Sequence, residues 1–129
     1  MQQALKEDTV TEATIDTINR FDEAFNRHDV DGIMALMTDD CVFEHITPAP
    51  DGQRLEGQAA VREAWVHLFS AFHDVYFDEE ELFAAGDRCV TRWTFTWKDD
   101  EGNPGRLRGT DIFRVKDGKV SEKLAYVKE

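Results

Sequence analysis

The chain has 129 residues, 41% of them hydrophobic with nine Phe and three Trp, which is enough for one packed core but too short for two domains. Its formal net charge of −12 at pH 7 excludes nucleic acid and anionic membrane surfaces as natural partners, because both carry negative charge. We therefore expect a single domain over residues 1–129, with residues 1–10 as a loosely ordered N-terminus.

Signals for membrane insertion, secretion and metal binding are missing from the sequence. No apolar run reaches the roughly 18 residues of a membrane span, and the opening MQQALKEDTV lacks the basic start and apolar stretch of a signal peptide. These observations predict a cytoplasmic protein. Cys41 and Cys89 form no metal-binding pair, and His67 and His73 are spaced too widely on one helix to share an ion. We expect no metal and no cofactor.

Helical periodicity dominates the first half of the chain. Apolar residues recur at helical spacing from Thr11 to His28, and a second, short helix is expected from Val30 to Met37. CVFEHI, residues 41–46, is typical of a strand, and the run 47–57, rich in Pro and Gly, is typical of a loop. Residues 58–73 carry the apolar stripe of a third helix.

Four strand-like runs make up the second half, at residues 75–85, 88–98, 106–115 and 119–128. Asp117-Gly118 between the last two is the strongest hairpin signal, because a type I′ turn needs positive φ at both central positions. Helices come first and antiparallel strands last, so the predicted fold class is α+β.

The strand CVTRWTFTWK, residues 89–98, has two faces of different character. One face carries Thr91, Trp93, Phe95 and Trp97, and the other carries Val90, Arg92, Thr94 and Thr96. Simple alternation places the aromatic face in the core and Arg92 in water. The opposite orientation would turn the polar face towards a pocket and leave the aromatic stripe on the outer surface.

Several strings resemble a known family. FNRHDVDGIMALMTDDCVFE (25–44), GQAAVREAW (57–65) and GTDIFRVKDGKVSEKLAYVK (109–128) are similar to the SnoaL-like branch of the nuclear transport factor 2-like superfamily. That superfamily includes ketosteroid isomerase, polyketide cyclases and limonene epoxide hydrolase. The resemblance implies a cone-shaped fold, in which a curved, mostly antiparallel sheet wraps around N-terminal helices and a pocket opens at the wide end.

The resemblance to ketosteroid isomerase also implies a site. The tyrosine that donates to the oxyanion in the isomerase falls on Phe21, so that donor is missing. The proton-shuttling aspartate falls on His45, and the protonated aspartic acid falls on Asp111. Arg92 falls where the isomerase has a pocket-lining aromatic side chain, which turns the polar face of its strand inwards.

Strand register supports part of this site. If the hairpin turn is centred near Glu101 and Gly102, Arg92 lies directly opposite Asp111, close enough for an ion pair that would lower the pKa of Asp111. His45 would abstract a proton next to a carbonyl, and Arg92 would hold the developing oxyanion. The alternative interpretation is that Arg92 and Asp111 form a purely structural cross-strand ion pair and that His45 is a core residue.

The remaining expected contacts follow from the same orientation. Substrate-binding residues are expected to be Phe21, Phe25, Phe43, Trp65, Phe69, Thr94 and Phe113, and a homodimer interface on the outer sheet face is expected from Trp93, Phe95 and Trp97. The resulting hypothesis is a cofactor-free acid/base isomerase or cyclase of a small hydrophobic carbonyl compound. The alternative is a non-catalytic module of the same fold that binds a small ligand or another protein.

Overall fold

The computed structural model describes the backbone of residues 2–128 and the side chains of residues 9–128. Its elements are α1 (Gln2–Asn26), α2 (Val30–Ala35), β1 (Met37–Glu44), β2 (Arg54–Glu56), α3 (Gln58–Ala71), β3 (His73–Ala85), β4 (Arg88–Lys98), β5 (Pro104–Lys116) and β6 (Lys119–Lys128). The predicted α+β class is confirmed. Helix α1 begins at Gln2 and so includes most of the segment expected to be loosely ordered, and the expected loop at 47–57 contains the short strand β2.

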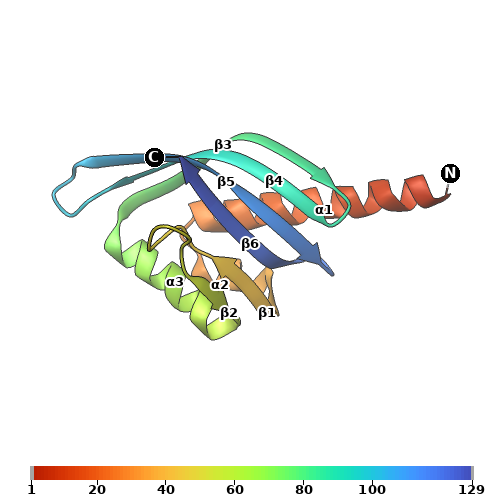
Figure 1. The fold of residues 1–129 in the computed structure, drawn as a ribbon, viewed down its shortest axis with the longest axis horizontal. Helices are drawn as coiled ribbons and strands as arrows, with labels where there is room; N and C mark the ends of the chain where they lie inside the picture. Colours follow the sequence, from red (N-terminus) through yellow and green to blue (C-terminus); the bar gives the residue numbers. More distant parts are fainter. Residues whose placement is uncertain (1, 129) are drawn as a thin grey trace.

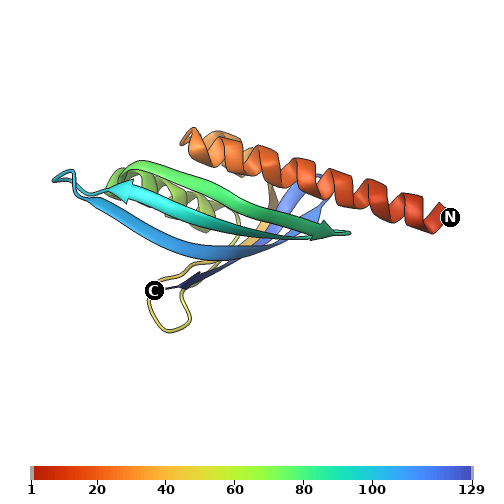
Figure 2. The same ribbon diagram turned by 90° about the horizontal axis from the view of Figure 1, so that it is seen from above.

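The six strands form one sheet in the order β2-β1-β6-β5-β4-β3. Strands β1 and β6 pair in parallel and all other neighbours are antiparallel. The sheet is curved, and α1 and α3 lie on the same side of it, while the N-terminal part of α1 extends past the ends of the strands (Figures 1 and 2). The predicted turn is confirmed, since Asp117 and Gly118 have φ of 52° and 74°.

The core lies between the helices and the concave face of the sheet. Helix α1 buries Ile18, Phe21 and Phe25, which lie on one helix face because they are three and four residues apart. Helix α3 adds Val61 and Trp65. Each fully buried side chain of this size contributes roughly 1.5–3 kcal/mol. No helix within the described residues is long and apolar enough to cross a membrane.

The aromatic face of β4 points towards the helices. Trp93 is 5% exposed, and Phe95 and Trp97 are partly buried against the core, whereas Arg92 is exposed. The expectation that Trp93, Phe95 and Trp97 form an outward dimer face is therefore wrong. Simple alternation gives the correct orientation, because burying these large rings outweighs any gain from burying the charged side.

Two glycines on β5 make room for this aromatic face. Gly109 pairs with Trp93 and Gly105 pairs with Trp97 across the β4–β5 ladder. A Cβ atom on Gly109 would lie 2.6 Å from the Trp93 ring, and a Cβ atom on Gly105 would overlap the Trp97 ring. Both indoles therefore lie directly over glycine backbone, a close approach that only glycine permits.

Candidate functional site

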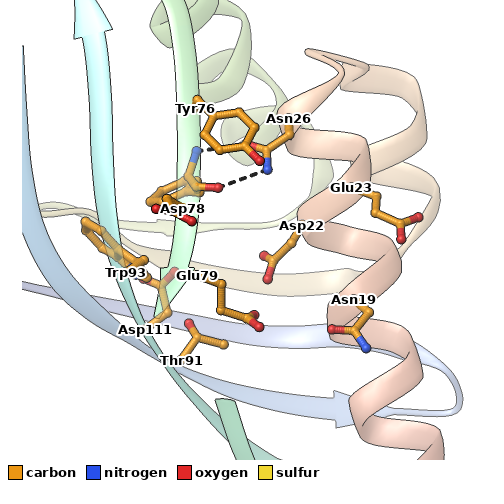
Figure 3. A pocket seen from close by; sticks show the side chains of 11 residues that line it. Asn19, Asp22, Glu23, Asn26, Tyr76, Asp78, Glu79, Thr91, Trp93 and Asp111 are labelled. Atoms are coloured by element: carbon orange, nitrogen blue, oxygen red, sulfur yellow. Dashed lines mark hydrogen bonds between the residues drawn. The ribbon is translucent and has the colours of Figure 1, made fainter. Parts of the chain in front are cut away.

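Two chambers lie on the concave side of the sheet. The first, of about 360 Å³, lies between α1 and strands β3 to β5, and its lining includes five carboxyl side chains: Asp22, Glu23, Asp78, Glu79 and Asp111. We call it the acidic chamber (Figure 3). The second, of about 70 Å³, is lined mainly by Phe25, Phe43, Trp65, Leu68, Phe95 and Leu107, and we call it the apolar chamber. Trp93 and Phe77 line both chambers, with ring centroids 4.8 Å apart in an edge-to-face contact, and so form the wall between them.

A buried ion pair joins the two chambers. Lys123 Nζ donates to Asp111 Oδ1 at 3.1 Å, and each side chain is only 4% exposed. Asp111 lines the acidic chamber and Lys123 lines the apolar one. Burial raises the pKa of Asp111, and the Lys123 ammonium and the nearby Trp93 indole oppose that rise without cancelling it. The Trp93 N–H itself has no hydrogen-bond partner among the described residues.

Aromatic rings surround the Lys123 ammonium. Its Nζ lies 4.8 Å from the centroid of Phe43, 5.7 Å from Trp65 and 5.8 Å from Phe77. These distances are within the range of cation–π attraction. Lys123 therefore presents a positive charge to an apolar cavity, with one carboxylate as its hydrogen-bond partner among the described side chains.

The acidic chamber concentrates negative charge between α1 and β3. Asp22 and Glu79 point into it from these two elements, and Asp111 borders it on the side of the sheet, next to Trp93 (Figure 3). Burial, followed by the charges of Asp111 and Glu79, raises the pKa of Asp22 well above its usual value. The Asn26 side chain fixes the β3 edge here, because it donates to Phe77 O and accepts from Phe77 N.

His45 stands at the entrance to the apolar chamber. It follows the last residue of β1, and it also lines an open groove of about 440 Å³ formed by residues of the 44–54 segment and the end of β6. The Thr47 backbone N–H donates to His45 Nδ1 at 3.0 Å, so the neutral ring carries its proton on Nε2. Burial lowers the pKa of His45, as do the charges of Lys123 and His67.

Arg92 does not belong to either chamber. It pairs with Thr110 rather than Asp111, and its side chain is 58% exposed, with ion pairs to Glu80 and Glu81 on the outer face of the sheet. The prediction that Arg92 faces Asp111 is wrong because the real hairpin register is shifted by one residue, which moves a side chain to the opposite face. Asp111 is instead paired with Lys123, and the pKa of Asp111 is raised, not lowered.

The predicted substrate-binding residues divide into three groups. Phe25, Phe43 and Trp65 line the apolar chamber. Phe21 and Phe113 are fully buried core, and Phe69 stacks on His28. Thr94 is on the outer face, where its hydroxyl donates to Glu80, so its expected place in the pocket is wrong.

Sequence reasoning missed Lys123, Asp22, Glu79 and the wall residue Trp93. The signal for Trp93 was present in the chain, because Gly105 and Gly109 on the neighbouring strand indicate which face must accommodate large rings. Three consecutive glutamates such as 79–81 are typical of a solvated run. Glu79 instead pairs with Trp93 on the inner face and lines the acidic chamber, whereas Glu80 contacts Arg108 outside, and the β-bulge after Glu79 sets Glu81 opposite the exposed Arg92.

The comparisons with known proteins agree on one family. Residues 18–123 match the SnoaL-like domain family. An NTF2-like protein of unknown function from Mesorhizobium loti is similar at 36% identity and a TM-score of 0.76, over 92% of this chain and 93% of that one. A putative polyketide cyclase from Xanthomonas campestris pv. campestris has 21% identity and a TM-score of 0.81, over 92% and 93% of the two chains.

An LEH-like epoxide hydrolase from M. tuberculosis has 19% identity and a TM-score of 0.78, over 92% of this chain and 84% of that one. At these identities the last two structures show the fold alone. No protein of curated function matches the chain.

Proposed function

Because the chain belongs to the SnoaL-like family of the nuclear transport factor 2-like superfamily, we propose that its apolar chamber holds a small carbonyl compound and catalyses its isomerisation or cyclisation by acid/base chemistry without a cofactor. The observation that carries this proposal is the buried Lys123 at the inner end of an aromatic chamber, with His45 at its entrance. A cation in a low-dielectric cavity stabilises a developing oxyanion far more strongly than it would in water.

Proton transfer is assigned to the Lys123–Asp111 pair. When Asp111 holds the proton, Lys123 is a neutral amine and accepts a proton from the carbon next to the carbonyl. The resulting ammonium and the Nε2–H of His45 then hold the enolate oxygen. The contact of 3.1 Å between Lys123 Nζ and Asp111 Oδ1 supports this arrangement, because it provides the path along which the proton moves between the two groups. His45 is a hydrogen-bond donor here, since the Thr47 N–H occupies its Nδ1.

The dimensions of the chamber limit the ligand. A cavity of about 70 Å³ is less than half of the roughly 150 Å³ that accommodates benzene, so a complete ring does not fit. His45, Ile46 and Ala125 line both the chamber and the open groove outside it. A ligand with a small carbonyl head and an apolar tail fits both spaces, with the head in the chamber and the tail in the groove.

The test is hydrogen–deuterium exchange at the carbon next to the carbonyl, followed by NMR in D₂O with methyl pentyl ketone as the probe. We expect wild-type protein to accelerate exchange, and Lys123→Met to abolish the acceleration. Arg92→Ala is the matched control, because Arg92 lies outside both chambers, and it should exchange at the wild-type rate. Acceleration that survives in Lys123→Met would overturn the proposal, whereas binding without exchange would make the domain a ligand-binding module.

A further inference from the structure

We propose that Lys123 is a covalent carbonyl-capturing residue, which forms an iminium bond with an aldehyde or methyl ketone placed in the apolar chamber. This inference rests on the proposed function, since it assigns the class of substrate and the intermediate of the same site. It differs in making the Lys123 nitrogen a nucleophile rather than a base alone.

The surroundings of Lys123 suit an amine nucleophile. Its side chain is 4% exposed and lies among four aromatic rings, so water competes weakly for the nitrogen lone pair. A lysine buried only for stability gains little, because desolvating two charges costs about as much as their attraction returns. Lys123 Nζ makes one hydrogen bond to a described side chain, that of Asp111, and Lys123 lines the apolar chamber.

Asp111 supplies the proton transfers that imine formation requires. It takes a proton from the Lys123 ammonium, and the free amine attacks the carbonyl carbon to give a carbinolamine. The proton held by Asp111 returns to the departing hydroxyl group, which leaves as water. The ammonium and the carbonyl compound are thereby converted into an iminium ion and one water, with the positive charge conserved. The Asp111 carboxylate at 3.1 Å then neutralises the iminium nitrogen as it did the ammonium.

The position of the nitrogen selects the substrate. Lys123 lines a chamber of about 70 Å³, which holds the volume of about two water molecules and therefore a formyl or acetyl group. His45 and Ala125 connect this volume to the open groove. Aldehydes and methyl ketones with an apolar chain fit this geometry, whereas a carbonyl flanked by two bulky groups cannot bring its carbon to Lys123.

Reductive trapping tests the proposal. Wild-type protein is incubated with methyl pentyl ketone and sodium cyanoborohydride, which reduces an iminium to a stable secondary amine, and the labelled residue is located by peptide mass spectrometry. We expect one heptyl group per chain, on Lys123. The exposed Lys98, Lys116 and Lys119 are internal comparators in the same sample. Lys123→Arg, which keeps the positive charge beside Asp111 but cannot form an imine, should lose the label while remaining folded by circular dichroism.

The outcomes separate this inference from the proposed function. Imine formation is supported if Lys123 is labelled, if the label is lost in Lys123→Arg, and if the rate of labelling is lower in Asp111→Asn. Label spread evenly over the lysines, or an unlabelled Lys123 in protein that still exchanges the ketone protons, overturns imine formation and leaves acid/base catalysis standing. Absence of label, exchange and any ketone-induced rise in Tm overturns both.

Discussion

Asp111 and Lys123 lie on the same face of the β5–β6 ladder because of a β-bulge. Asp111 pairs with Ala125, and Lys123 pairs with Phe113, so the two charged residues are diagonal neighbours on one face of the sheet. The register shift between Arg114 and Val115 creates this arrangement. Without it, the Asp117–Gly118 turn would set Asp111 opposite Leu124, and Lys123 would point to the outer face.

The first prediction concerns the stability of this ion pair. Lys123→Met leaves a buried carboxyl without its partner and should lower the free energy of unfolding by about 3–5 kcal/mol, measured by urea denaturation. The double variant Asp111→Leu with Lys123→Met should recover most of that loss, because no charge then remains buried. Arg92→Ala, which breaks only exposed ion pairs, should cost no more than about 1 kcal/mol. An equally damaging Arg92→Ala would contradict this account.

The second prediction concerns the titration of His45. Lys123 is one of the causes of its lowered pKa, so Lys123→Met should raise the His45 pKa towards its usual value of 6.5. Lys123→Arg keeps the positive charge and should leave it lowered. The imidazole shifts followed by NMR across neutral pH give the measurement, with Arg92→Ala as a control that should not move it. An unchanged titration in Lys123→Met would contradict the prediction, because burial and His67 would then account for the lowered pKa of His45 without Lys123.

The third prediction concerns Asp22 and pH. Its pKa is raised in the folded state, so the folded protein binds this proton more strongly than the unfolded chain. The contribution of Asp22 to stability therefore falls as pH rises from its ordinary value of 3.8 through the raised pKa. Asp22→Asn should raise Tm relative to wild type at neutral pH, and the difference should shrink to nothing below pH 3.8. Glu23→Gln, which removes an exposed carboxylate one residue further along α1, is the matched control for the loss of one negative charge.

The fourth prediction concerns the glycine beneath Trp93. In Gly109→Ala the new methyl group would press on the Trp93 ring and on the backbone of Tyr126, and overpacking of this kind costs about 1–3 kcal/mol. Indole fluorescence should change in the same variant, since Trp93 must move. Thr96→Ala, at an exposed position of β4, should stay within about 0.5 kcal/mol of wild type. A neutral Gly109→Ala would show that the ring is not held against β5.

Much of the fold was predictable because its signals are local. The apolar stripe containing Phe21 and Phe25 fixes α1, and Asp117–Gly118 fixes the last hairpin. The site depends on register, which local patterns do not encode. A shift of one residue in the β4–β5 hairpin removed Arg92 from the interior, and a bulge in the β5–β6 hairpin brought Lys123 into it. His45 and Asp111 were identified through the family resemblance, which does not depend on register, and each lines one of the two chambers.

The wall formed by Trp93 and Phe77 has a consequence for how this domain could change its ligand. The two compartments share these rings, so a change in either ring alters both compartments. A smaller side chain at position 93 would fuse them into one cavity with an aromatic end and an end bearing Asp22 and Glu79. Such a cavity suits an amphiphilic amine instead of a neutral carbonyl compound. Trp93, together with Phe77, thus keeps an aromatic interior apart from an acidic one.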